Sequence, residues 1–117
     1  EKRVFMIAHT KGEFPMQAAE HEKEVLSVGK YTFSKANFDT AIQVIRDAIQ
    51  KNGWLIIDEV GPLELRNEGF NSILKEVLTN RTEKTLVVVR EGLTNEVENH
   101  FLITDAIVVN DIKKLPD

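Results

Sequence analysis

Residues 54–57 form an unbroken apolar run that ends in two adjacent carboxylates, Asp58 and Glu59. The run has the length of a strand and shows no alternation between apolar and polar side chains. A strand that is apolar on both faces is usually covered by helices on both sides, as in a parallel sheet. The run therefore predicts a buried parallel strand over residues 54–58 that delivers its two acids at the carboxyl end.

Helical and extended patterns alternate along the rest of the chain. From residue 35 the order is helix, strand, helix, strand, helix, strand, over the ranges 35–51, 54–58, 68–80, 85–89, 94–101 and 105–109. Ser34 or Asn37 can cap the first helix, and Thr94 can cap the third. Such alternation is typical of an α/β fold with a mostly parallel sheet flanked by helices. In open sheets of this kind, ligands bind at the carboxyl ends of the strands.

The first 33 residues are rich in extended patterns. Residues 4–8 are apolar, and turn-forming residues 10–13 precede Phe14, which predicts an N-terminal β-hairpin. Pro15 restricts the second arm to a sheet edge. Residues 25–33 alternate and predict one further strand.

Composition limits the class of protein. The 117 residues predict a single α/β domain over 1–117, and a hydrophobic fraction of 42% suffices for a core. A net charge of −4 with interspersed signs argues against a nucleic-acid partner. No apolar run approaches the roughly 18 residues of a membrane span. The absence of cysteine fits a cytoplasmic location.

The two carboxylates are the first candidates for a site. Asp58 would hold Mg²⁺, which favours one or two carboxylates together with phosphate oxygens and waters. Glu59 would polarise the water that attacks a γ-phosphate. The alternative is structural, because acids are common at solvated strand ends.

The segment around these acids resembles a known family. Residues 55–65 contain the pattern aliphatic-aliphatic-Asp-Glu-aliphatic-Gly-x-aliphatic-Glu-aliphatic, matched at every position from Ile56 to Leu65. The segment resembles the Walker B stretch of the P-loop nucleoside-triphosphatases first described in thermophiles. Residues 28–31 are similar to the family's Gly-Lys-Tyr segment. Phe70 matches an apolar position, and Arg90 matches the basic residue that ends the next strand. The resemblance covers residues 25–110 best.

The resemblance implies a Mg²⁺-dependent hydrolase of ATP or GTP with a P-loop type sheet. By position, Asp58 would be the magnesium residue and Glu59 the catalytic residue that activates water. Gly61 would let the backbone approach the phosphates of the bound nucleotide, and Glu64 would line the same rim.

Two basic residues complete the candidate set. Arg90 would contact the γ-phosphate as a second catalytic residue, or it is a surface arginine paired with Glu91 or Glu96. Lys30 would stand near the phosphates in the nucleotide-binding set, or it is an exposed loop lysine.

One part of the family's pattern is missing. No Gly-x-x-x-x-Gly-Lys-Ser/Thr phosphate loop occurs in the 117 residues, so the chain corresponds to the C-terminal portion of the fold. The loop's lysine and hydroxyl neutralise phosphate charge and complete the magnesium shell. The chain alone is therefore expected to be inactive as a hydrolase.

Two other classes of function stay open. The strand ahead of the phosphate loop would lie between residues 85–89 and 105–109, and its absence leaves unpaired edges that recruit another chain. A non-catalytic nucleotide-binding or oligomerising module would self-associate or pair with a missing N-terminal segment. A phosphoacceptor receiver domain is disfavoured, because residues 4–10 supply no acidic pair.

Overall fold

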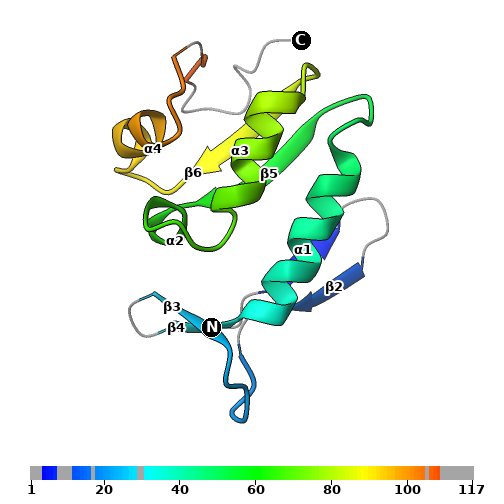
Figure 1. The fold of residues 1–117 in the computed structure, drawn as a ribbon, viewed down its shortest axis with the longest axis vertical. Helices are drawn as coiled ribbons and strands as arrows, with labels where there is room; N and C mark the ends of the chain where they lie inside the picture. The colour runs from blue at the N-terminus through cyan, green and yellow to red at the C-terminus, as the bar shows by residue number, and fades with distance from the viewer. Residues whose placement is uncertain (1–3, 8–11, 17, 29–30, 105, 109–117) are drawn as a thin grey trace.

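A computed structural model describes residues 4–7, 12–16, 18–28, 31–104 and 106–108 (Figure 1). Its strands are β1 Val4–Ile7, β2 Gly12–Pro15, β3 Val25–Val28, β4 Tyr31–Ser34, β5 Leu55–Val60 and β6 Thr85–Val89. Its helices are α1 Lys35–Ala48, α2 Pro62–Leu65, α3 Asn71–Asn80 and α4 Thr94–His100. The helix–strand alternation expected from residue 35 is thus present as far as α4.

β5 and β6 pair in parallel, as the sequence predicts. Leu55 pairs with Thr85 and Asp58 pairs with Val88, and the register then shifts so that Val60 pairs with Val89. β6 has the predicted bounds, whereas β5 continues two residues beyond the predicted end at Asp58. The two acids therefore lie in the last part of a paired strand rather than beyond it.

The two faces of the β5–β6 sheet differ in burial. Ile57 and Val60 are buried. α3 lies across one face of the sheet (Figure 1). On the opposite face, Ile56 is 57% exposed. The prediction that helices cover both faces is therefore wrong within the described residues, because only one of these faces is buried. The apolar side chain of Ile56 is therefore exposed to solvent in the described part of the chain.

Side chains from α1, β5, α3 and α4 come together in the main core. The most deeply buried side chains of this core are Ile57, Val60, Ile73, Leu74, Val77 and Val97. The rings of Phe38 and Phe70 join α1 to the start of α3, with centroids 5.2 Å apart. Phe33 continues this contact, with its ring centroid 5.9 Å from that of Phe38. Burial of such apolar area is the main favourable contribution to folding.

Both ends of α1 are satisfied by side chains. At the start, Ser34 Oγ accepts from the backbone N–H of Asn37 over 3.2 Å, so Ser34 is the cap. At the other end, Arg81 Nη1 donates to the carbonyl oxygens of Ala48, Ile49 and Lys51 over 3.0, 2.9 and 2.9 Å. The Ala48 carbonyl also accepts from the backbone N–H of Lys51 over 3.0 Å. Arg81, the residue after α3, therefore stabilises the C-terminal end of α1 and ties it to the end of α3.

The N-terminal strands form two antiparallel pairs. β1 pairs with β2, and residues 8–11 between them lie outside the described residues. β3 pairs with β4, with Val28 opposite Tyr31. The single strand predicted over residues 25–33 is therefore wrong, because the chain reverses direction between Val28 and Tyr31. Both short strands alternate apolar and polar residues, so the sequence pattern does not distinguish them from one longer strand.

Two predictions near the C-terminus also need correction. Thr94 is the first residue of α4 rather than its cap, and Leu93 occupies the cap position without a side-chain hydrogen bond. Residues 106–108 of the predicted strand 105–109 are not in a strand, while residues 105 and 109 lie outside the described residues. No described strand pairs with the second edge of β6. No helix among the described residues is long and apolar enough to cross a membrane.

Candidate active site

The carboxyl ends of β5 and β6 bring three of the predicted site residues to one edge of the sheet (Figure 1). Asp58 and Glu59 lie near the end of β5, and Arg90 follows β6 directly. The backbone N–H of Arg90 donates to the carbonyl oxygen of Val60 over 2.8 Å. This bond holds Val60, the residue after the two acids, next to Arg90, which carries the positive charge.

Gly61 lies directly against the Arg90 side chain. A Cβ atom added to Gly61 would lie 3.5 Å from Arg90 Cβ and 3.6 Å from its Cδ, which is ordinary van der Waals contact. The φ angle of Gly61 is −162°, an extended backbone that any residue adopts. Neither space nor backbone among the described residues therefore requires glycine here.

The charged groups at this edge are exposed and unpartnered within the described part of the chain. Asp58 and Glu59 make no side-chain hydrogen bond or ion pair to a described residue. Arg90 is also exposed, and it forms no ion pair with Glu91 or Glu96. The surface pairing considered for Arg90 is thus not present, and none of the three side chains has a side-chain partner among the described residues.

The described donors at this end of the sheet do not form a closed metal site. No group of three or more histidine and acidic side chains among the described residues could enclose a metal ion. Mg²⁺ is commonly held by one or two carboxylates together with substrate phosphates and waters. A single exposed Asp58 carboxylate fits that arrangement and does not fit a closed structural metal site.

A short helical turn, α2, follows the two acids and precedes the helix predicted over residues 68–80. Pro62 occupies its first position, where a missing backbone N–H is harmless. Glu64, at the third position, reaches back to the backbone N–H of Gly61 over 2.8 Å. This is the return half of a capping box. Gly61 has no side chain for the other half, so the usual Ser/Thr-x-x-Glu signal is absent from the sequence.

Glu64 lies beneath this turn instead of on an open rim. Its side chain is buried, with 3% exposure. One carboxylate oxygen accepts from Gly61, and the other accepts from the backbone N–H of Phe70 over 2.9 Å. Burial raises the pKa of the Glu64 carboxyl, and the nearby charge of Glu59 adds to this more weakly, against the lowering effect of the backbone N–H groups.

A polar cluster behind α2 was not recognised in the sequence. Asn71 Nδ2 donates to the backbone oxygen of Glu64 over 2.8 Å. His100 Nε2 lies 3.1 Å from Asn71 Nδ2 and 3.0 Å from Asn67 Oδ1. Asn67 has a φ of +65°, a conformation that asparagine tolerates better than most residues. The cluster links α4 to the turn, and an Asn in a turn was its only local signal.

Lys30, the remaining predicted site residue, lies outside the described residues. The predicted set is therefore divided: the acids and Arg90 share an edge, Gly61 lies beside Arg90, and Glu64 is buried below.

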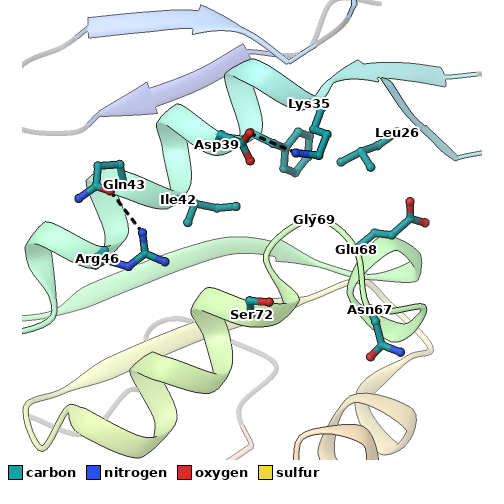
Figure 2. A pocket seen from close by; sticks show the side chains of 11 residues that line it. Leu26, Lys35, Asp39, Ile42, Gln43, Arg46, Asn67, Glu68, Gly69 and Ser72 are labelled. Atoms are coloured by element: carbon teal, nitrogen blue, oxygen red, sulfur yellow. Dashed lines mark hydrogen bonds and ion pairs between the residues drawn. The ribbon is translucent and has the colours of Figure 1, made fainter. Parts of the chain in front are cut away.

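A pocket of about 560 Å³ lies away from this edge, between α1 and the residues that lead into α3 (Figure 2). Its lining includes Phe38, Ile42 and Gly69 but none of Asp58, Glu59 or Arg90. Lys35 Nζ lies 3.3 Å from Asp39, and Arg46 Nη1 donates to Gln43 over 3.2 Å. Because these charged side chains are already partnered, the pocket offers a ligand little free charge.

Two comparisons relate the chain to known proteins. The sequence model of the NTPase family matches residues 1–114. A Nucleoside-triphosphatase THEP1 from Methanopyrus kandleri is 28% identical over 78 residues, which amount to 67% of this chain and 40% of that protein. The chain thus spans less than half the length of this curated relative. No solved structure matches the chain.

Proposed function

Because the chain belongs to the NTPase family, whose model covers residues 1–114, we propose that it supplies the carboxylate half of a nucleoside-triphosphatase site. The family membership predicted from residues 55–65 is thereby confirmed. The proposed reaction is Mg²⁺-dependent hydrolysis of ATP or GTP to the diphosphate and phosphate. The site lies where the carboxyl ends of β5 and β6 meet.

The observation that carries this proposal is the meeting of exposed acids and an exposed cation at one sheet edge. The 2.8 Å bond from Arg90 N–H to the Val60 carbonyl supports it, because it ties the two strand ends together. Asp58 would hold the metal. Glu59 would accept a hydrogen bond from the attacking water and orient it, and Arg90 would contact the γ-phosphate.

Each residue has a role that its charge dictates. Mg²⁺, when bound, would neutralise phosphate charge and hold the phosphate oxygens near Asp58. Arg90 would stabilise negative charge on the γ-phosphoryl group as it passes from the diphosphate to water, since a planar guanidinium suits phosphate geometry. Glycine at position 61 would let the phosphates approach the backbone more closely than a larger residue would. This would explain the glycine, which the contacts with described residues do not require.

This half of the site is not expected to work by itself. Two carboxylates repel a triphosphate, and the 117 residues contain no phosphate loop to compensate. We propose that a segment carrying such a loop pairs with the second edge of β6 and covers the sheet face that exposes Ile56. The exposure of Ile56 and the lack of a described partner for that edge support this placement.

A second candidate function is an interaction module that self-associates through the same surfaces. The exposed apolar side chains of Trp54 and Ile56 favour it, because an unpaired sheet edge beside an apolar face readily recruits another chain. Light scattering after size-exclusion chromatography distinguishes the two. A dimer that persists when the loop-bearing segment is added would favour the module.

The proposed hydrolase is tested by phosphate release from Mg·ATP and Mg·GTP. The 117-residue chain alone should release no phosphate above background. A longer polypeptide with a Gly-x-x-x-x-Gly-Lys-Ser/Thr segment ahead of residue 1 should release it only when Mg²⁺ is present. Hydrolysis by the short chain, or none by the long one, would overturn the proposal.

A further inference from the structure

We infer that Glu64 is a positioning residue, which fixes the Asp58–Glu59 end of β5 by clamping both ends of the turn that follows it. Its importance for catalysis rests on the proposed function, but the clamp itself is a separate claim. Glu64 therefore acts through the backbone and does not contact a ligand.

The carboxylate of Glu64 joins two backbone groups that are nine residues apart. Its two oxygens accept from the N–H groups of Gly61 and Phe70, over 2.8 and 2.9 Å. Its own backbone oxygen accepts from Asn71 Nδ2 over 2.8 Å. With both oxygens engaged and the side chain 3% exposed, Glu64 has no open position for a phosphate or a metal ion.

Gly69 shows how closely the turn is built around this carboxylate. A Cβ atom added to Gly69 would lie 2.2 Å from Glu64 Oε2, a separation that real Cβ atoms do not adopt. It would also lie 3.1 Å from Leu63 Cβ. Glycine at this position is thus required by the position of the Glu64 carboxylate, in addition to its φ of +60°.

The clamp connects directly to the proposed site. Gly61 follows Val60, whose carbonyl accepts from Arg90 N–H, and Gly61 also lies against the Arg90 side chain. The charge of Glu59 is also felt at Glu64. Fixing Gly61 therefore fixes the backbone two residues beyond Glu59, next to the side chain of Arg90.

A carboxylate is needed because both of its oxygens accept. A glutamine would offer one acceptor and one NH₂ group, and that NH₂ would face a backbone N–H. One buried donor would then lose its partner, which is among the more destabilising changes that a single atom can cause. Glu64→Gln keeps the size of the side chain and removes one arm of the clamp.

The test uses three variants of the full chain: Glu64→Gln, Gly69→Ala and the control Gly53→Ala. Gly53 also has a positive φ, of +91°, but a Cβ there meets nothing within 4 Å. Amide hydrogen exchange is followed by NMR at Gly61, Phe70 and Arg90, with Ile45 in α1 as the reference. Paramagnetic broadening by Mn²⁺ alone is followed at the Asp58 and Glu59 amides.

In Glu64→Gln and Gly69→Ala, exchange at Gly61, Phe70 and Arg90 should speed up roughly tenfold or more, while Ile45 is unchanged. The Mn²⁺ concentration for half-maximal broadening should rise about tenfold or more, as for loss of a group that orients a metal ligand. Gly53→Ala should change neither. Because Gly69→Ala leaves Glu64 itself in place, the test does not depend on one variant folding.

Three results would overturn the inference: unchanged exchange at Gly61 and Phe70, equal acceleration at Ile45, or Mn²⁺ broadening that matches the wild type. A different result would show that the proposed function is wrong. If Mn²⁺ broadens neither acid in the wild-type chain, the metal assignment of Asp58 falls. Exchange at Arg90 then decides alone whether Glu64 positions this edge.

Discussion

Arg90 donates its backbone N–H to the carbonyl oxygen of Val60 over 2.8 Å, one residue after the Asp58–Glu59 pair. This bond extends the β5–β6 pairing past the last residue of β6. It places two exposed acids and one exposed base at the same edge, where ligands of open parallel sheets bind. The proposed triphosphatase site depends on this one connection between neighbouring strands.

Arg81 should contribute more to stability than an exposed arginine of similar length. Arg81→Ala removes donors to the carbonyls of Ala48, Ile49 and Lys51 at the end of α1. Bonds from a charged donor contribute about 1.5–3 kcal/mol, so urea unfolding should show a loss of about 2 kcal/mol with an unchanged m-value.

Arg46→Ala is the matched control for that change. Arg46 pairs with Glu76 over 2.9 Å in a solvent-exposed bridge between α1 and α3. Because exposed ion pairs contribute little, its urea midpoint should stay close to that of the wild type. Equal effects of the two substitutions would show that Arg81 has no special role at the helix end.

Ile56 and Ile57 are neighbours on opposite faces of β5, and their replacement by alanine should destabilise the chain to very different extents. Ile57→Ala leaves a cavity beneath α3 and should destabilise the chain by about 2–5 kcal/mol in urea unfolding. Ile56→Ala removes a side chain that is 57% exposed, so its effect on the isolated chain should be far smaller.

The same pair tests the proposed covering segment. Ile56→Ala should weaken association with the loop-bearing segment, measured by titration calorimetry, although it scarcely changes the stability of the chain alone. If Ile56→Ala destabilises the isolated chain as much as Ile57→Ala, the open face is covered in solution and the placement of the segment is wrong.

The pH dependence of stability should carry the signature of Glu64. Its folded-state pKa is raised above the ordinary glutamate value of 4.5, chiefly by burial. Between these two values the folded state binds more protons than the unfolded state, so the free energy of unfolding falls as pH rises through that window. Glu64→Gln cannot titrate and should lack this fall.

Urea titrations of both proteins at a series of pH values above 4.5 measure this difference. The pKa of Glu22 is lowered by its backbone hydrogen bond to Ala19, and that of Glu76 by its hydrogen bond to Arg46. Their contributions are lost only as pH falls through their folded pKa values, below the Glu64 window. Parallel curves for wild type and Glu64→Gln above 4.5 would contradict the assignment.

The sequence predicted the parts of the fold that depend on local periodicity. The strand at 85–89 has its predicted bounds, and Ser34 caps α1 as one of two predicted candidates. The apolar run after Trp54 is a parallel strand, and its acids face the same edge as Arg90. These features follow from side-chain spacing alone, because a strand and a helix impose different repeats.

The parts that depend on distant contacts were missed. Alternation over 25–33 does not reveal that Val28 faces Tyr31 across an antiparallel pair. A uniformly apolar strand predicts cover on both faces, yet cover depends on which other segments are present. The motif placed Glu64 on a ligand rim, because nothing in local spacing shows that Phe70 and Gly69 fold back onto its carboxylate.

The central claim is tested most directly by single-turnover phosphate release from Mg·ATP in the longer, loop-bearing polypeptide, with Asp58→Asn, Glu59→Gln and Glu91→Gln compared with the wild type. Glu59→Gln should keep nucleotide binding and lower the hydrolysis rate about 100-fold or more, as for loss of a group that orients the attacking water. Asp58→Asn should raise the Mg²⁺ concentration required, and Glu91→Gln, an exposed neighbour of Arg90, should change neither. Hydrolysis at the wild-type rate by Glu59→Gln would contradict the account.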